Sequence, residues 1–183
     1  MGIDAGQMTG MGARAVFLDR DGIINTPVIR EGRPYPPQSL QEFVYVEGIG
    51  GVLRELRGRG FELFVVTNQP DVARGTTPKA LVEAFHARIL AELPIRQIYS
   101  CYHDGPDACE CRKPKPGFLL QAAGEHGLDL GRSFMVGDRW RDIDCGHRAG
   151  CATLFVDYGY REALRSPPTF TVRRVTDILQ YIH

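Results

Sequence analysis

The sequence lacks an excess of charge of either sign, because 22 lysine and arginine residues balance 22 aspartate and glutamate residues. This balance argues against nucleic acid or an anionic membrane as partner, since both are bound through clustered positive charge. No apolar run approaches the roughly 18 residues of a membrane span. The N-terminus also lacks the charged, apolar and small-residue order of a signal peptide. We therefore expect a cytoplasmic protein with a small-molecule partner.

The chain also lacks internal repeats, and its 183 residues suit a single domain. Residues 1–12, MGIDAGQMTGMG, are rich in glycine and methionine without periodicity. We expect a flexible leader over residues 1–12 and one domain over residues 13–183.

Apolar strands and helices alternate along this domain, a pattern typical of an α/β fold with a parallel sheet covered on both faces. The four prolines of residues 26–43 predict an irregular surface loop. Thr77 and Pro78 are expected to cap and begin a helix. The predicted strands are 15–18, 61–66, 98–99, 133–138, 152–157 and 170–172, and the predicted helices lie around 52–56, 78–93, 116–127, 141–150 and from Thr176.

Polar side chains follow three of the predicted strands. Asp19 and Asp21 follow the first strand, Thr67 and Asn68 end the second, and Asp138 ends the fourth. Ligands of open parallel sheets bind beyond these carboxyl ends, so we expect the carboxylates to meet in one crevice. They would repel one another without a cation, and oxygen ligands favour Mg²⁺.

Positive charge is expected near the same crevice from Arg112 and Lys113. A divalent ion, a carboxylate nucleophile and nearby cations are the groups that phosphoryl transfer requires. An aspartate at a strand end can instead be a turn former or a helix cap, which is the stronger reading for Asp138 or Asp142 taken alone. The order of the motifs favours the catalytic interpretation.

That order resembles the haloacid dehalogenase (HAD) superfamily, subfamily IIIA. FLDRDG is similar to its first motif, VVTNQ to its second, Lys113 of CRKPKPG to its third and VGDRWRDID to its fourth. Ile23 departs from the pattern, because many members have threonine there. The resemblance implies a three-layer α/β/α, Rossmann-like fold with a central parallel sheet.

The resemblance also implies a role for each motif residue. Asp19 would attack phosphorus and become a phospho-aspartate, while Asp21 would act as general acid and then as general base. Magnesium would be bound by Asp19, Asp138 and the backbone carbonyl of Asp21, with Asp142 as a further ligand or a supporting neighbour. Thr67 and Lys113 would complete the catalytic set. The residues expected to bind the substrate are Asn25, Asn68, Gln69, Arg112 and Arg139.

A second cluster lies in residues 101–111. Cys101, His103, Cys109 and Cys111 form C-x-H-x5-C-x-C, which suits a closed, structural tetrahedral zinc site. Disulfides are not expected in a cytoplasmic protein. Zinc would fix the direction of Arg112 and Lys113, which follow the cluster directly. The cysteines and histidines outside it are expected to be small buried residues (Cys145, Cys151) and solvated or helix-surface residues (His86, His126, His147, His183).

No large cap domain fits, because about 46 residues separate Asp21 from Thr67 and about 46 separate Thr67 from Lys113. Capless members with a zinc loop act on D-glycero-D-manno-heptose 1,7-bisphosphate or on histidinol phosphate. TNQPDVARG is similar to the pattern of the heptose group, although Pro70-Asp71 replaces its commoner Ser-Gly. We expect a monomeric phosphatase that removes the 7-phosphate of the heptose bisphosphate in surface-sugar precursor synthesis.

Three alternatives remain from the sequence. Histidinol phosphate would be hydrolysed by the same mechanism with a different leaving group. A non-catalytic, zinc-stabilised module that binds a phosphorylated ligand would not need the Asp19 and Asp21 pair. A nucleic-acid-binding zinc module is disfavoured by the neutral charge.

Overall fold

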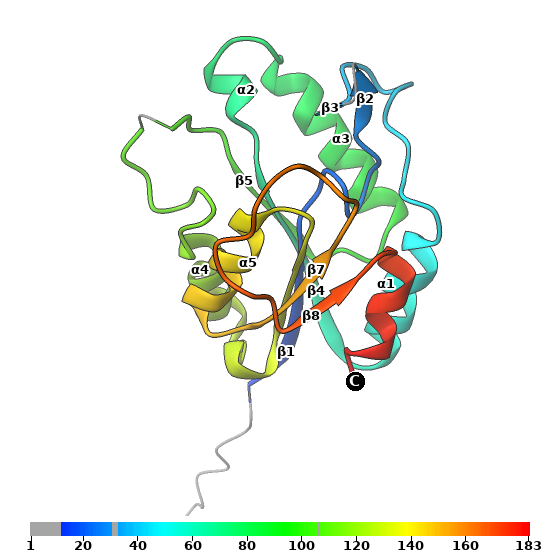
Figure 1. Cartoon of the computed structure of the whole chain (residues 1–183), viewed down its shortest axis with the longest axis vertical. Helices are drawn as coiled ribbons and strands as arrows, with labels where there is room; N and C mark the ends of the chain where they lie inside the picture. The colour runs from blue at the N-terminus through cyan, green and yellow to red at the C-terminus, as the bar shows by residue number, and fades with distance from the viewer. Residues whose placement is uncertain (1–11, 31–32, 106) are drawn as a thin grey trace, which may run out of the picture.

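The computed structural model describes residues 12–30, 33–105 and 107–183. The leader expected over residues 1–12 lies, apart from Gly12, outside the described residues. Six parallel strands form the main sheet in the order β5-β4-β1-β6-β7-β8 (Figure 1). They are β1 (Arg14–Leu18), β4 (Phe61–Asn68), β5 (Gln97–Cys101), β6 (Phe134–Gly137), β7 (Ala152–Val156) and β8 (Phe170–Val172).

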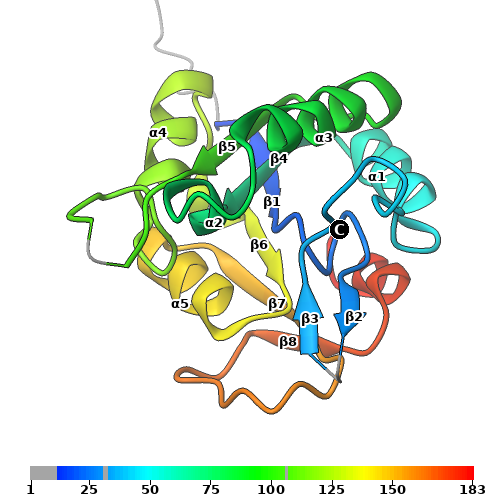
Figure 2. The same ribbon diagram turned by 90° about the horizontal axis from the view of Figure 1, so that it is seen from above.

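Helices cover both faces of this sheet, as the alternation of strands and helices predicts. Seen from above in Figure 2, α1, α3 and η2 lie on one side of the sheet, and α4 and α5 lie on the other. The elements are α1 (Ile49–Gly58), α2 (Pro70–Ala73), α3 (Lys79–Glu92), α4 (Gly117–His126), α5 (Trp140–Ala149) and the short 3₁₀ helices η1 (Leu130–Arg132) and η2 (Val175–Gln180). The expected three-layer α/β/α fold is confirmed.

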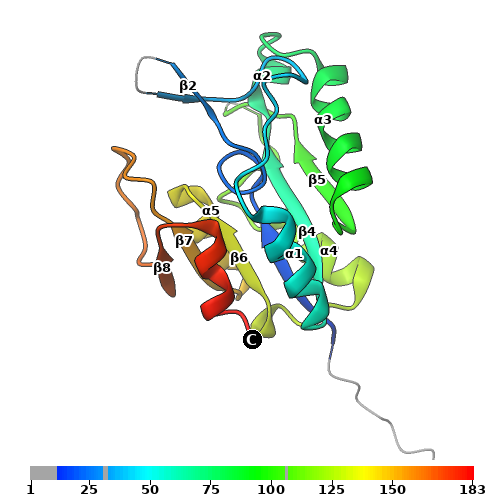
Figure 3. The ribbon, with the colours of Figure 1, turned by 90° about the vertical axis from the view of Figure 1, so that its right-hand side faces the viewer.

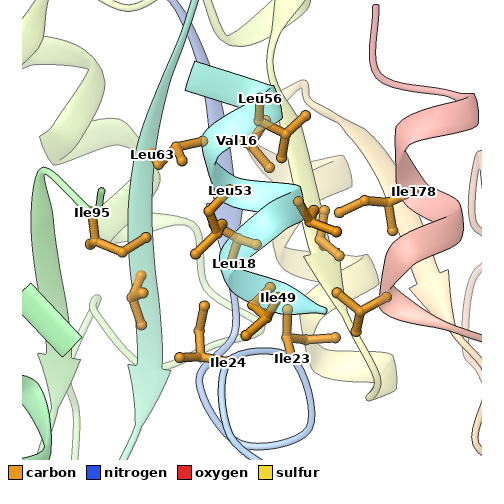
Figure 4. Close-up of a cluster of buried hydrophobic side chains, with 14 of the residues drawn as sticks. Val16, Leu18, Ile23, Ile24, Ile49, Leu53, Leu56, Leu63, Ile95 and Ile178 are labelled. Carbon is orange, nitrogen blue, oxygen red and sulfur yellow. The ribbon is translucent and has the colours of Figure 1, made fainter. Parts of the chain in front are cut away.

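The two faces of β1 show why the core has two parts. Val16 and Leu18 point to the α1 side, where they pack with Leu53 of α1 and Ile178 of η2 (Figure 4). Ala15 and Phe17 point to the opposite side and join a second cluster with residues of α4 and α5. A strand buried on both faces reads as an uninterrupted apolar run, as β1 does.

The strand order places the ends of β1, β4 and β6 side by side. The chain runs from β1 outward through β4 to β5, then crosses back to β6 on the other flank of β1. This reversal creates a crevice at the carboxyl ends of the central strands, where open α/β sheets bind ligands. Side chains that follow β1, β4 and β6 therefore converge.

The proline-rich segment is more regular than the sequence predicts. It contains an antiparallel hairpin of β2 (Val28–Arg30) and β3 (Arg33–Tyr35), in which Ile29 pairs with Pro34. Proline is tolerated here because a two-stranded ribbon has only edge strands. In Figure 3 this hairpin and α2 lie at the same end of the sheet. Among the described residues, the connections on either side of β4 contain this hairpin, α1, α2 and α3, and no large cap domain.

Two helix predictions need correction. Pro78 has extended backbone (φ −60°, ψ 133°) and stands before α3, so Thr77 is not the cap and Pro78 is not the first helical residue. The carbonyl of Pro78 accepts the first helical hydrogen bond, from Leu81 N at 3.0 Å. The predicted helix from Thr176 is the 3₁₀ helix η2. None of the helices in the described ranges has the length and apolarity needed to cross a bilayer.

Candidate active site

A cavity of about 320 Å³ opens at the carboxyl ends of the central strands. Most residues that the sequence predicts for catalysis and binding contribute to its wall, and the hairpin and α2 supply further parts. The lining residues are Asp19, Asp21, Pro27, Tyr35, Pro36, Thr67, Asn68, Gln69, Pro70, Asp71, Arg74, Arg112, Lys113, Asp138, Arg139, Arg141 and Asp142.

Three carboxylates meet on the floor of this cavity. One oxygen from each of Asp19, Asp138 and Asp142 lies within 4.8 Å of the others. Oδ1 of Asp138 is buried and has no hydrogen-bond partner. Burial, together with the charges of Asp19 and Asp142, raises the pKa of Asp138 well above its ordinary value. An all-oxygen cluster with an orphaned buried oxygen fits a divalent cation such as Mg²⁺.

Glycines allow these carboxylates to come close to the backbone. Gly22 has φ +94°, and a Cβ there would overlap the carboxylate of Asp138. A Cβ on Gly137 would overlap the side chain of Asp142. Both positions therefore exclude larger residues, which gives a physical reason for the glycine that follows Asp21.

Lys113 is the buried counter-charge of the cluster. Its Nζ donates to Val66 O at 2.7 Å and lies 2.8 Å from Asp19 Oδ1 and 2.7 Å from Asp142 Oδ1. Burial alone would lower the pKa of Lys113, but the two carboxylates outweigh it and raise the pKa. The ammonium group thus stays charged and is held in one position.

Asp19 has one oxygen engaged and one available. Oδ1 accepts from Arg20 N at 2.7 Å and from Lys113, whereas no described residue hydrogen-bonds Oδ2. The side chain is 13% exposed, on the wall of the cavity. Burial raises the pKa of Asp19 to about 6, and Lys113 opposes this increase. The available oxygen is suited to nucleophilic attack.

Asp21 is held differently from Asp19. Nη2 of Arg20 contacts both its oxygens, at 3.0 and 2.9 Å, and Asn25 Nδ2 and Gln69 Nε2 donate to it at 3.0 and 2.9 Å. Burial alone would raise the pKa of Asp21, but the charge of Arg20 and these hydrogen bonds lower it. The carboxylate of Asp21 is not among the three clustered carboxylates, so only its backbone carbonyl remains as the expected metal ligand.

The structure places Asn25 behind Asp21. Asn25 is fully buried and is not part of the cavity wall, so it supports Asp21 and offers no surface for the substrate contact that the sequence predicts. Asn68 and Gln69 do line the cavity, but their amides also make internal bonds. Asn68 brackets the backbone of Lys113 with two bonds of 3.0 Å, and Gln69 donates to Thr67 Oγ1 at 2.9 Å.

Four arginines line the cavity, of which the sequence reading identified Arg112 and Arg139 and missed Arg74 and Arg141. Arg139 pairs with Glu162, and Arg74 makes two bonds to Asp104 at 2.8 and 2.7 Å. Arg112 donates to the carbonyl of His103 at 2.9 Å. The arginines offer N–H donors that suit an anionic ligand, and Asp71, Asp104 and Glu162 are their acidic partners in the free protein.

Cys101, His103, Cys109 and Cys111 come together as a second group. Their Sγ and Nδ1 atoms lie within 4.8 Å of one another, for example 3.8 Å between Cys101 and Cys109 and 3.3 Å between His103 and Cys111. Three thiols and one imidazole with this spacing fit zinc. All five cysteines are free, and Cys145 and Cys151 are buried outside the cluster, as expected.

Three further positions singled out in the sequence have the following places in the structure. His86 is not a surface residue, because only 8% of it is exposed and it contacts the guanidinium of Arg20. Ile23, where threonine is common, is fully buried in the core. Pro70 and Asp71 form the first turn of α2, at the cavity wall.

Comparisons with known proteins agree with this site. The family described as "HAD-hyrolase-like" matches residues 110–178. The D-glycero-beta-D-manno-heptose-1,7-bisphosphate 7-phosphatase of Helicobacter pylori is 39% identical over 142 residues, 74% of this chain and 78% of that protein. The D-glycero-alpha-D-manno-heptose-1,7-bisphosphate 7-phosphatase of Campylobacter jejuni is 36% identical over 151 residues, 80% of this chain and 83% of that protein.

A solved structure extends the likeness. The D,D-heptose 1.7-bisphosphate phosphatase from B. bronchiseptica, complexed with magnesium and phosphate, superimposes with a TM-score of 0.77 at 27% identity, covering 91% of this chain and 96% of that one. Fold and site thus define a HAD-type phosphatase. Within that class, the chain belongs to the family of the heptose-1,7-bisphosphate 7-phosphatases.

Proposed function

We propose that the protein is a magnesium-dependent phosphatase that removes the 7-phosphate of D-glycero-D-manno-heptose 1,7-bisphosphate through a phospho-aspartate on Asp19. The observation that carries this proposal is the available oxygen of Asp19, set beside Asp138 and Asp142 and backed by Lys113. The named activities of the relatives support the choice of substrate.

Magnesium would be held by Asp19, Asp138 and the backbone carbonyl of Asp21, with Asp142 beside it, and would neutralise charge on the phosphoryl oxygens. The orphaned Oδ1 of Asp138 supports this assignment. Thr67 and Lys113 would bind and orient the same oxygens.

Oδ2 of Asp19 attacks phosphorus, and the bond to the sugar O7 breaks. Asp21 is ionised in the free protein, the form that accepts a proton. The negative charge of a bound phosphate raises the pKa of Asp21, because a like charge favours the protonated carboxyl group. Asp21 can then take up a proton from solvent as the substrate binds, give it to the leaving O7, and afterwards take a proton from the water that releases phosphate from Asp19.

The second phosphate of the substrate would lie in the outer, arginine-lined part of the cavity, with Arg112 as its expected contact and Arg139 nearby. Zinc in the Cys101–Cys111 loop would be structural, since four side chains leave no open coordination position. It would hold Arg112 through the carbonyl of His103.

The substrate assignment is tested by kcat/KM for the heptose 1,7-bisphosphate against histidinol phosphate, both with Mg²⁺. We expect a preference for the heptose bisphosphate of at least two orders of magnitude, because histidinol phosphate has no second phosphate for the arginines. A preference for histidinol phosphate would overturn the substrate while keeping the phosphatase. Turnover of neither compound would favour a binding module.

The remaining architecture is proposed as one domain over residues 13–183 that acts as a monomer. Every group in the mechanism comes from one chain, so no second subunit is needed to complete the cavity. Light scattering of the purified protein tests this, with the monomer mass of 20.4 kDa expected.

A further inference from the structure

Arg20, the residue between the two motif aspartates, is a fully buried cation. Its Nη2 contacts both oxygens of Asp21, and its guanidinium lies 5.6 Å from the ring centroid of Phe85 on α3. Burying a guanidinium is costly unless its N–H groups find acceptors. The position of Arg20 therefore depends on the acceptors around its guanidinium group.

The Nη1 side of the guanidinium faces His86, also on α3. Nη1 of Arg20 lies 3.3 Å from Nε2 of His86, and Nδ1 of His86 lies 3.5 Å from Ser100 Oγ. A guanidinium can only donate, so Nε2 must be an unprotonated acceptor and the ring proton must be on Nδ1. Burial and the charge of Arg20 lower the pKa of His86 to about 4, which keeps the ring neutral.

Among the described residues, His86 and Asp21 are the only side chains that accept hydrogen bonds from this guanidinium. Arg20 is thus bonded at one edge to the carboxylate in the cavity and at the other to a ring on a regular helix. Arginine has several rotatable bonds, so a contact to one partner alone leaves its plane free to turn. The helix and the loop after β1 are joined through this residue.

We propose that His86 is a positioning residue for catalysis, which fixes the direction of the Asp21 carboxylate by accepting a hydrogen bond from Arg20. This inference rests on the proposed function, because it gives Asp21 the role of proton donor and acceptor. His86 itself touches no substrate and is not part of the cavity wall. Its loss should affect proton transfer and leave phosphate binding by Lys113 and Arg112 unchanged.

The dependence on leaving group distinguishes this role from general support of the fold. A sugar alkoxide needs a proton as its bond to phosphorus breaks, whereas p-nitrophenolate leaves readily without one. A misdirected Asp21 should therefore lower kcat/KM for the heptose bisphosphate much more than for p-nitrophenyl phosphate. A loosened fold would lower both alike.

The experiment compares His86→Leu, which lacks an acceptor, with His86→Gln, whose amide oxygen can replace Nε2. We expect His86→Leu to reduce kcat/KM for the heptose bisphosphate on the order of tenfold more than for p-nitrophenyl phosphate. KM for the heptose bisphosphate should change less than about twofold, and His86→Gln should restore most of the loss.

His126→Leu is the matched control. His126 is half-buried on α4, packed 5.0 Å from the Phe64 ring centroid on the other face of the sheet, and it contacts no residue of the site. It should show the natural ratio between the two substrates. If His86→Leu does not fold, His86→Asn, whose oxygen reaches less far, replaces it and should again be inferior to His86→Gln.

Folded His86 variants that keep the natural ratio between substrates, or lose both activities in parallel, would overturn the positioning role and leave the proposed phosphatase intact. Absence of all phosphatase activity in the natural protein would overturn both.

Discussion

The ammonium group of Lys113 lies 2.8 Å from Oδ1 of Asp19, on the wall of the cavity. The same group lies 2.7 Å from Asp142, so one buried cation compensates two carboxylates. Lys113 itself comes from the loop that follows the Cys/His cluster, and Asn68 brackets its backbone. This relationship joins the proposed nucleophile, Asp19, to a carboxylate of the proposed magnesium site, Asp142, through one buried cation.

Lys113→Met should therefore cost both stability and activity. Asp19 and Asp142 would remain buried without their cation, and breaking a buried ion pair in this way costs about 3–5 kcal/mol of unfolding free energy. Added Mg²⁺ should restore part of this loss, because it supplies positive charge to the same carboxylates. Urea unfolding with and without Mg²⁺ measures the effect.

Lys79→Met is the control for this change, since Lys79 is exposed on α3, where it pairs with Glu83 and lies over the ring of Tyr102. It should alter stability by less than about 1 kcal/mol. A Lys113→Met protein as stable and as active as the natural one would contradict the assignment of Lys113.

Magnesium should stabilise the folded protein through Asp138. Once its concentration exceeds the dissociation constant, each tenfold increase should add about 1.4 kcal/mol to the free energy of unfolding. Asp138→Asn should remove this dependence. Asp177→Asn, on η2 and outside the cavity, should keep it. Equal magnesium dependence in the two variants would exclude Asp138 as a ligand.

Loss of zinc should also weaken the active site, through the loop that carries Arg112 and Lys113. Cys109→Ser should lower the bound zinc, the unfolding midpoint and kcat together, because the loop positions Arg112 and Lys113. Cys151→Ala removes a buried thiol outside the cluster and should leave the zinc content unchanged. Metal analysis of the purified variants, combined with kcat, tests this. Full activity in zinc-free protein would refute a supporting role for the loop.

His86 should make stability depend on pH. Its pKa is lowered from 6.5 to about 4, so the unfolded chain takes up this proton first as the pH falls. His86 should contribute a decrease of up to about 3 kcal/mol in the free energy of unfolding between pH 6.5 and 4. This contribution is measured as the difference from His86→Gln, because the raised pKa values of Asp19 and Asp138 act in the opposite direction over the same range. The same pH dependence in both proteins would be inconsistent with the buried, neutral ring.

Much of this architecture was predictable because it follows from local patterns. The apolar run before Asp19 and the glycine after α4 set a strand and a helix end that the structure contains. The convergence of Asp19 with Asp138 follows from parallel strands once β1 and β6 are neighbours in the sheet. The cluster of His103 with three cysteines could likewise be predicted from residue spacing alone.

Other features depended on contacts distant in sequence. The one local signal for the burial of Arg20 is its place between two aspartates. Its residue type alone suggests a solvated side chain. His86 lies on a regular helix, and the side chains that contact it, Arg20 and Ser100, come from other parts of the chain. The burial of Asn25 and its hydrogen bond to Asp21 depend on the tertiary turn after β1.

The central claim is that Asp19 is the nucleophile, and phosphate release by Asp19→Asn tests it most directly. The amide conserves size but cannot form the acyl phosphate, so release from the heptose bisphosphate with Mg²⁺ should fall by about three orders of magnitude or more. Circular dichroism and zinc content should match the natural protein. A folded Asp19→Asn protein that releases phosphate at the natural rate would contradict the account.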